Sequence, residues 1–309
     1  MDGTEVSFGI VILLQISIGS VANVFLLLFY TSVISASPKP SSSDLILAHL
    51  ALANTIILLT YGIPEALSAW GWRNFLDVVG CKILIYFYRV SRGLSICSTC
   101  LLSVFQAVTI SPGTSRWVGA KAKLPQRIIP FCVLSWLLNM LIEVSVLIYM
   151  TGAQNSSSVR LILDLKYCST ISASEASVLA VAIALALRDL FFVGLMSLAS
   201  GYMVLVLYRH HRQVRHIHGT GRSSTAMPEV TAAKRVVALV IVYVLLYGRQ
   251  AVTLSILMNM KGTSPLLMNS HMVLRFTFWV ISPFLMIVSD RRMRTFWRRG
   301  SPGSEADPS

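Results

Sequence analysis

The sequence predicts an all-α membrane protein, a bundle of seven transmembrane helices with its amino terminus outside the cell. Three observations support this fold class: the chain of 309 residues is 55% hydrophobic, only 13% of its residues are charged, and the apolar residues gather in long runs. A soluble domain is usually less apolar, and polar residues interrupt it more often. Bulk lipid is therefore the solvent that this composition fits.

Each apolar run is long enough to cross a bilayer as a helix. About 20 apolar residues span a hydrocarbon core of about 30 Å, and in lipid only helices or closed barrels satisfy every backbone polar group. The first run has no basic start and is too long for a signal peptide, so we expect it to be retained. One membrane domain, 1–290, then precedes a short tail, 291–309. The predicted spans are 7–32, 43–66, 81–110, 128–151, 177–207, 235–258 and 270–289.

The distribution of basic residues predicts the orientation of the bundle. A net charge of +13 is compatible with nucleic-acid binding, but the basic residues lie between the apolar runs, so we expect membrane lipid as the partner and no nucleic acid. Sixteen of the 26 Lys and Arg residues lie on one side of the spans and five on the other, which by the positive-inside rule makes the richer side cytoplasmic. The glycosylation sequon at Asn155 then lies in an outer loop.

Two of the five cysteines lie on the side predicted to be outside. Cys81 opens the third span and Cys168 lies between the fourth and fifth spans, so both face an oxidising compartment, and we predict a disulfide between them. The alternative is two unpaired thiols. The other three cysteines lie within spans and are expected to pack as small apolar residues. Because the C-x-x-C at 97–100 has no second ligand pair, we expect no metal and no cofactor.

Seven ionisable residues lie inside the predicted spans, where charge is costly and usually faces the bundle interior. Their helical rise places them roughly 10–18 Å below the outer surface. They can form ion pairs that fix helix packing, Glu143 with Arg89 or Arg92 and Asp189 with Arg92. Alternatively, the five arginines of this set, which include Arg188, outnumber its two carboxylates and form a polar pocket for an anionic or acceptor-rich amphipathic ligand. The candidate pocket residues are Arg89, Arg92, Glu143, Asp189, Arg249 and Arg275.

The stretch RVSRGLSICSTCLLSVFQAVTISPGTSRW, residues 89–117, resembles the third-helix signature of vomeronasal type-1 pheromone receptors. The similarity extends from about residue 19 to residue 290. Asn23 resembles the first-helix asparagine of the rhodopsin-like superfamily, and Asn54 stands where most of its members carry a sodium-binding aspartate. Phe105-Gln106-Ala107 replaces their acidic-Arg-aromatic triplet, and Ser282-Pro283 replaces Asn-Pro. These replacements are typical of the vomeronasal family and of its bitter-taste relatives.

The resemblance implies a chemosensory G-protein-coupled receptor in the plasma membrane. It implies a small pheromone-like ligand that enters from outside and a heterotrimeric G protein of the inhibitory type that binds inside. The cytoplasmic loop 208–235 and the tail from Asp290 are the expected partner surfaces, and we expect 291–299 to form an amphipathic helix on the inner leaflet. The candidate G-protein-facing residues are Gln106, Arg209, Arg212, Arg215 and Arg235.

Other functions stay open at this point. Arg249, His271 and Arg275 are unusual even for the resembled family, which leaves a decayed or non-signalling member as an alternative, beside a bitter-taste-like receptor. Charge within the membrane is also typical of transporters, but an odd number of spans and the lack of an inverted repeat disfavour one. The sequence contains no serine, histidine and acid arrangement and no phosphate-binding glycine loop, so we do not expect an enzyme.

Overall fold

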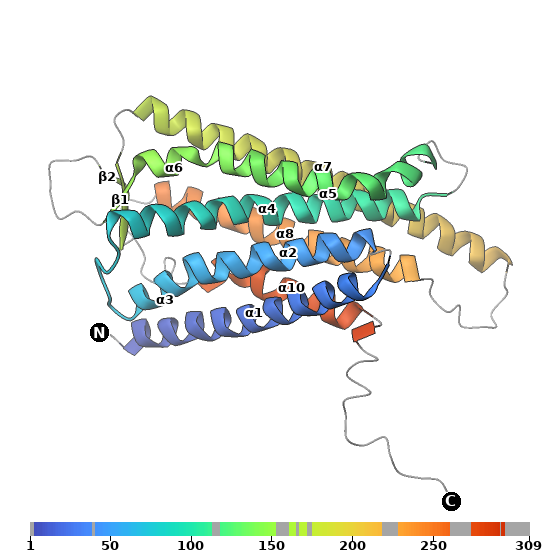
Figure 1. The fold of residues 1–309 in the computed structure, drawn as a ribbon, viewed down its shortest axis with the longest axis horizontal. Coiled ribbons are helices and arrows are strands. Elements are labelled where there is room, and N and C mark those ends of the chain that lie inside the picture. The colour runs from blue at the N-terminus through green and yellow to red at the C-terminus, as the bar shows by residue number, and fades with distance from the viewer. Residues whose placement is uncertain are drawn as a thin grey trace, which may run out of the picture.

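The computed structural model is mostly helical, with long helices that lie roughly side by side and a small β-sheet at one end of the bundle (Figure 1). It describes residues 3–38, 41–112, 118–152, 161–164, 167–171, 175–217, 228–259, 273–290 and 292–293. The helices are α1 (Gly3–Ala36), α2 (Ser42–Ile57), α3 (Ile63–Ala69), α4 (Val78–Ile110), α5 (Val118–Ile142), α6 (Val144–Tyr149), α7 (Glu175–Ile217), α8 (Pro228–Asn259) and α10 (Thr277–Ser289).

Six helical segments of the described chain are long and apolar enough to cross a membrane, and each overlaps one of the first six predicted spans. These segments are Ser7–Ala36, Ser42–Ala69, Val78–Ile110, Lys121–Tyr149, Ala180–His210 and Val230–Arg249. The second contains a π-helical turn, η1 (Leu58–Gly62), which ends two residues before Pro64. The proline has no N–H for a regular helical hydrogen bond.

The seventh segment is shorter than the sequence predicts. A span was expected over 270–289, whereas α10 has 13 residues, and 270–272 lie outside the described residues. The helix is interrupted at Phe276, whose fully buried ring packs against Tyr61 and Trp279 with centroids 5.8 and 6.1 Å apart. α10 therefore begins directly after a buried aromatic contact, and hydropathy alone does not reveal this position.

The connection between α6 and α7 contains a three-stranded antiparallel sheet, whereas the sequence predicts only a loop there. The strands are β1 (Met150–Gly152), β2 (Leu161–Asp164) and β3 (Cys168–Ile171), in the order β1-β3-β2. Gly152 pairs with Cys168, so the central strand starts at a half-cystine. Strands this short need tertiary support, and the disulfide described below supplies it.

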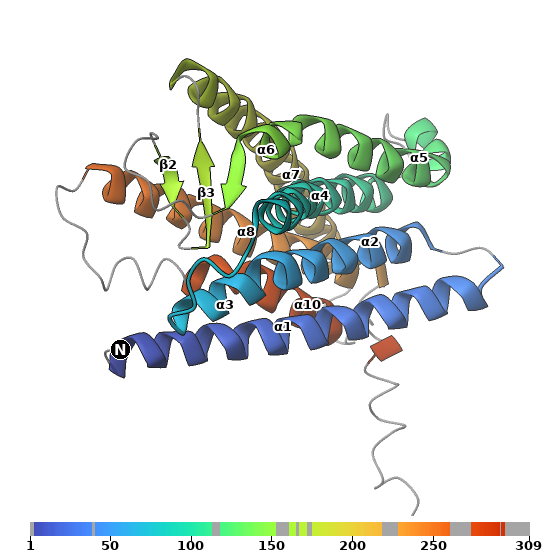
Figure 2. The ribbon, with the colours of Figure 1, turned by 60° about the vertical axis from the view of Figure 1, so that its left-hand side comes forward.

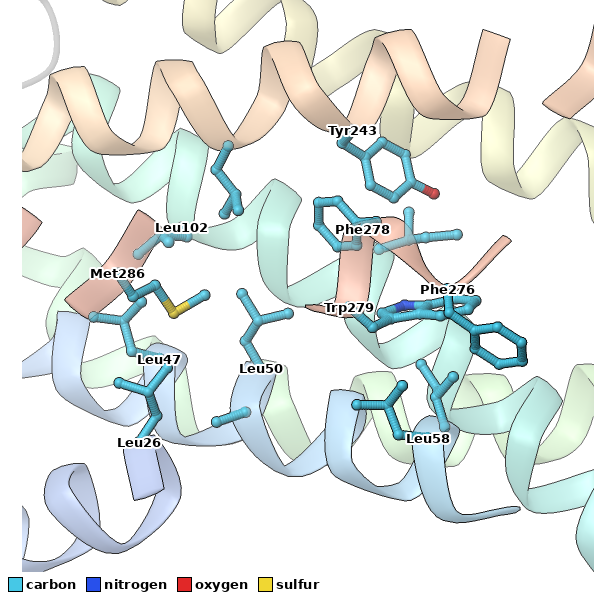
Figure 3. Close-up of a cluster of buried hydrophobic side chains, with 14 of the residues drawn as sticks. Leu26, Leu47, Leu50, Leu58, Leu102, Tyr243, Phe276, Phe278, Trp279 and Met286 are labelled. Carbon is cyan, nitrogen blue, oxygen red and sulfur yellow. The ribbon is translucent and has the colours of Figure 1, made fainter. Parts of the chain in front are cut away.

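The apolar core lies where α1, α2, α4, α8 and α10 meet. Figure 3 shows side chains from these helices converging, with Leu26, Leu47 and Leu50 on one side and Phe278 and Tyr243 on the other. Large apolar side chains on the outside remain exposed, such as Leu28 at 64%, Leu141 at 72% and Leu198 at 74%. Such an arrangement fits lipid as the surrounding solvent, because water would disfavour that much exposed apolar surface.

The two ends of the bundle differ. The β-sheet and the start of α1 lie at one end, which we call the disulfide end (Figure 2). At the other end, Tyr30 at the end of α1 donates to Asp290 Oδ2 at 3.4 Å, and Arg292 donates to both oxygens of Asp44 at 3.0 and 2.7 Å. We call this end the Asp44 end. The start of α1 and the end of α10 thus lie at opposite ends.

Candidate functional site

Five charged side chains form a continuous chain of ion pairs across α4, the α5–α6 junction and α7. Arg89 Nη1 lies 3.6 Å from Glu143 Oε2, and Arg188 Nη1 lies 2.9 Å from Glu143 Oε1. Arg188 Nη2 lies 3.0 Å from Asp189 Oδ1, and Asp189 also accepts a hydrogen bond from Arg92. Three positive and two negative groups give this charge chain a net charge of +1, with a cation at each end.

The ion pairs predicted for the two carboxylates are present: Glu143 contacts Arg89, and Asp189 contacts Arg92. Arg188 and Asp189 are adjacent in α7, so their side chains leave the helix about 100° apart. The long Arg188 side chain nevertheless bonds both its neighbour and Glu143, which flexible arginine geometry allows.

A helix break and a close helix contact position the charge chain, and neither was predicted from the sequence. Glu143 lies at the break between α5 and α6, with φ −88° and ψ 4°. Asn139, four residues earlier and hence on the same helix face, accepts from Arg188 Nη1 at 3.3 Å. A Cβ at Gly93 would overlap Asn139 Oδ1, so only glycine allows α4 to approach α5 here. The i, i+4 spacing of Asn139 and Glu143 was the one sign in the sequence that both side chains face the same neighbour.

A central cavity of about 40 Å³ lies between α4, α8 and α10. Arg92 reaches it from α4, and Arg275 reaches it from the residues just before α10. Arg275 also donates to the Tyr61 hydroxyl and lies 5.4 Å from the centroid of that ring. The remaining lining is mainly apolar and aromatic: Ser95, Ile96, Tyr243, Leu246, Tyr247, Leu274, Phe278 and Trp279.

The six candidate pocket residues do not all line this central cavity. Arg92 and Arg275 do, whereas Arg89 lines a second cavity between α4, α6 and α7. Glu143 and Asp189 lie within the charge chain and line neither of the two, and the same holds for the partly buried Arg249 on α8.

A neutral hydrogen-bond network holds α1, α2, α4 and α10 together beside the central cavity. Asn54 donates to Asn23 Oδ1 at 3.2 Å and to Ser282 Oγ at 3.1 Å, and it accepts from Ser95 at 2.9 Å. Asn23 donates to the backbone carbonyl of Trp279 at 2.9 Å. Pro283, four residues after Trp279, has no N–H for that carbonyl, so Asn23 satisfies an acceptor that the proline leaves free.

The disulfide end is fixed by a covalent bond and by a buried tyrosine. Cys81 and Cys168 form the predicted disulfide, with their Cα atoms 5.7 Å apart. Tyr167, beside it and fully buried, donates to Glu65 Oε2 on α3 at 3.2 Å. The connection after α6 is thus tied to both α3 and α4. Asn155, the predicted glycosylation site, lies outside the described residues.

At the Asp44 end, charged residues tie the last residues of the described chain to α2. Burial alone would raise the pKa of Asp290, but side-chain and backbone hydrogen bonds from Arg292 outweigh it and hold the pKa below its ordinary value.

The residues predicted to face the G protein differ in exposure. Gln106 is buried and donates to Ser43 Oγ at 3.2 Å. Arg209 and Arg212 are exposed near the end of α7, Arg235 is partly buried on α8, and the side chain of Arg215 lies outside the described residues. The expected amphipathic helix 291–299 also lies largely outside them.

Comparison with known proteins agrees with this architecture. The family model described as "Vomeronasal organ pheromone receptor family" matches residues 6–299. The chain therefore belongs to this receptor family, a class of chemosensory receptors of the G-protein-coupled kind with several membrane-spanning helices.

Individual relatives agree along most of their length. The chain is 36% identical to "Olfactory receptor class A-like protein 1" of Danio rerio, over 93% of this chain and 90% of that protein. It is also 36% identical to "Vomeronasal type-1 receptor 3" of Homo sapiens, over 93% and 92%. For "Vomeronasal type-1 receptor 2" of Homo sapiens the identity is 37%, over 90% of this chain and 70% of that protein.

Proposed function

We propose that this protein is a plasma-membrane receptor that binds a small pheromone-like ligand in the central cavity and signals to a heterotrimeric G protein at the Asp44 end. The disulfide end then faces the outside and the Asp44 end the cytoplasm. Membership of the vomeronasal family supports the receptor role. The positive-inside distribution of Lys and Arg supports the orientation.

The observation that carries the ligand assignment is the convergence of Arg92 and Arg275 on one cavity with aromatic walls. Two guanidinium groups, one from α4 and one from the residues just before α10, favour a ligand with acceptor oxygens, while Phe278 and Trp279 favour an apolar body. An amphipathic molecule with an anionic or acceptor-rich group has both properties. Such a molecule contacts α4 through Arg92 and the start of the seventh segment through Arg275 at the same time.

The small cavity indicates how binding leads to signalling. A volume of about 40 Å³ is far below the roughly 300 Å³ at which small-molecule sites begin. A ligand therefore binds a more open arrangement of α4, α8 and α10 than the one described, and its differential affinity shifts the population toward that arrangement. The G protein, of the inhibitory type by family resemblance, recognises the Asp44 end of the shifted bundle. Gln106, Arg209, Arg212, Arg215 and Arg235 are the proposed contacts.

The test is a G-protein activation assay with a panel of steroid-like and volatile molecules. Once an agonist is found, Leu246→Phe fills the central cavity while every charged side chain stays in place, and we expect the EC50 of the agonist to rise at least tenfold. Leu245→Phe adds the same ring at a neighbouring position that is 66% exposed, and it should respond like the wild type. Equal responses of both variants would contradict the assignment.

A second variant and a staining experiment complete the test. Arg92→Ala removes one of the two guanidinium groups and should abolish the response to acidic agonists, whereas Lys82→Ala removes a charge from the outer end of α4 and should retain it. An N-terminal epitope tag should stain on intact cells, and a C-terminal tag only after permeabilisation. Staining of both tags on intact cells contradicts the proposed orientation.

A further inference from the structure

A second cavity, separate from the central one, lies on the other side of the charge chain. Its volume is about 160 Å³, four times that of the central cavity. Its lining residues come from α4, α6, the first residue of β1 and α7, and Figure 2 shows α6 and α7 near the end of α4 that carries the β-sheet. We call this second cavity the lateral cavity. Its lining residues are Arg89, Ser145, Val146, Tyr149, Met150, Val181, Ala182 and Leu185.

The lateral cavity faces the surroundings of the bundle rather than its axis. Its flanks carry exposed apolar side chains, Ile148 on α6 at 65% and Ile183 on α7 at 50%. In a membrane these positions contact lipid, so the cavity opens into the bilayer. Arg89 lies eleven residues after Val78, the first residue of α4, which corresponds to about 16 Å at 1.5 Å per residue. A molecule dissolved in the outer leaflet can therefore reach Arg89 from the side.

Among the described residues that line this cavity, Arg89 is the one with a charged side chain, and its ion pair is long. Its only ion pair in the described residues is with Glu143 at 3.6 Å, a separation too long for a hydrogen bond. Glu143 Oε2 is buried and has no hydrogen-bond partner among the described residues, whereas the other oxygen, Oε1, accepts from Arg188 Nη1 at 2.9 Å. Arg92, at the opposite end of the charge chain, by contrast donates directly to Asp189.

We propose that the lateral cavity binds a free anionic amphiphile, a molecule with one carboxylate or sulfate group and a hydrocarbon chain, whose head pairs with Arg89. The excess charge of +1 on the charge chain is most available at Arg89, and an anion there makes the whole assembly neutral in a low-dielectric setting. Ser145 of α6 also lines the cavity and can donate a further hydrogen bond. The hydrocarbon chain extends between α6 and α7 into lipid.

The size of the lateral cavity favours a single-chain acid over a phospholipid. About 160 Å³ is below the range of drug-sized sites, so the cavity accommodates a small head and the first carbons of one chain. Val146, Val181 and Leu185 provide the apolar walls for those carbons. A phosphodiester with two acyl chains and a glycerol needs more room than this at the level of Arg89.

The experiment uses the purified full-length protein in neutral phosphatidylcholine nanodiscs and a medium-chain fatty acid that carries a diazirine. We expect photolabelling on peptides from α6 and α7, competed by the unmodified acid but not by its methyl ester. Arg89→Gln should weaken half-maximal labelling roughly tenfold or more, the usual weight of a hydrogen bond to a charged group. Lys82→Gln removes the same charge two helical turns away and should label like the wild type.

A size variant tests the site independently of the charge. Ala182→Phe places a ring inside the lateral cavity and should abolish labelling, while Ala184→Phe, an exposed position on the same helix outside the lining, should not. Labelling that survives both Arg89→Gln and Ala182→Phe, or equal competition by the methyl ester, overturns the proposal. Competition by phosphatidic acid but not by the free acid overturns it in favour of a structural lipid. Because the assay needs neither agonist nor G protein, its failure leaves the proposed receptor function untouched.

Discussion

The two polar regions inside this bundle are built on opposite principles. The neutral network of Asn23, Asn54, Ser95 and Ser282 links α1, α2, α4 and α10 with short bonds between uncharged groups. The charge chain links α4, the α5–α6 junction and α7 with five ionised side chains, and one carboxylate oxygen in it has no hydrogen bond in the described structure. In the neutral network the polar groups pair with one another, whereas the charge chain has one more cation than anions and lies between two cavities.

This difference suits the neutral network to helix packing and the charge chain to ligand recognition. Neutral amide and hydroxyl groups inside a membrane cost little once they are paired, so they are suited to fixing the register of helices. Buried ion pairs carry a large desolvation cost that hydrophobic packing would avoid, and they are weak evidence of stability. A surplus charge at the cavities is therefore better explained by a ligand than by packing.

The largest effect is expected from removing a carboxylate of the charge chain. Glu143→Gln keeps the shape of the side chain but deprives Arg89 and Arg188 of the carboxylate that they share, which raises the net charge from +1 to +2. Breaking a buried pair from one side costs about 3–5 kcal/mol. Thermal unfolding in nanodiscs should show this as the lowest melting temperature of the variants described here. A melting temperature like that of Asp44→Asn would show that the charge chain is solvated.

The next effect is steric and tests whether α4 and α5 pack as closely as described. Gly93→Ala places a Cβ against Asn139 Oδ1 and should cost up to about 3 kcal/mol, the upper end for overpacking. Gly194→Ala on α7 is the matched control, since nothing lies within 4 Å of its added Cβ, and it should melt like the wild type. Adding Asn139→Ala should rescue part of the Gly93→Ala loss. No difference between the two glycine variants would refute the close approach.

A smaller effect is expected from the neutral network. Asn54→Leu removes three side-chain hydrogen bonds, which at roughly 0.6 kcal/mol each in a membrane amounts to about 2 kcal/mol. Its melting temperature should fall between those of Glu143→Gln and Asp44→Asn. Ser95→Ala, which removes one of the three bonds, should show about a third of the loss. A loss as large as that of Glu143→Gln would remove the distinction between the two regions.

The smallest effect is expected at the Asp44 end. Asp44→Asn weakens the pair with Arg292, whose side chain is 48% exposed, and water screens such pairs to about 1 kcal/mol or less. Arg292 also pairs with Asp290 at 3.0 Å, and this second contact is unaffected by the substitution. The melting temperature should change by only a few degrees, while basal G-protein activation reports whether this contact also restrains signalling. A loss above that of Asn54→Leu would contradict the ranking.

Much of the fold and part of the candidate site follow from the sequence alone. Hydropathy located six spans, because about 20 consecutive apolar residues have few alternatives to a membrane helix. The positions of Cys81 and Cys168 on one side of the membrane predicted their disulfide. The depths of Glu143 and Asp189 predicted Arg89 or Arg92 as the partner of the first and Arg92 as the partner of the second. The bridging role of Arg188 between the two carboxylates was not predicted.

Only the tertiary structure decided how these charges are divided between two cavities. Arg89 and Arg92 are three residues apart on α4, yet the first lines the lateral cavity and the second the central one. Which neighbour covers each face of a helix depends on close approaches such as that at Gly93 and on breaks such as those at Glu143 and Phe276. Hydropathy does not predict these close approaches and breaks. The membrane determines the depth of a residue, but only packing determines which neighbour the residue faces around the helix axis.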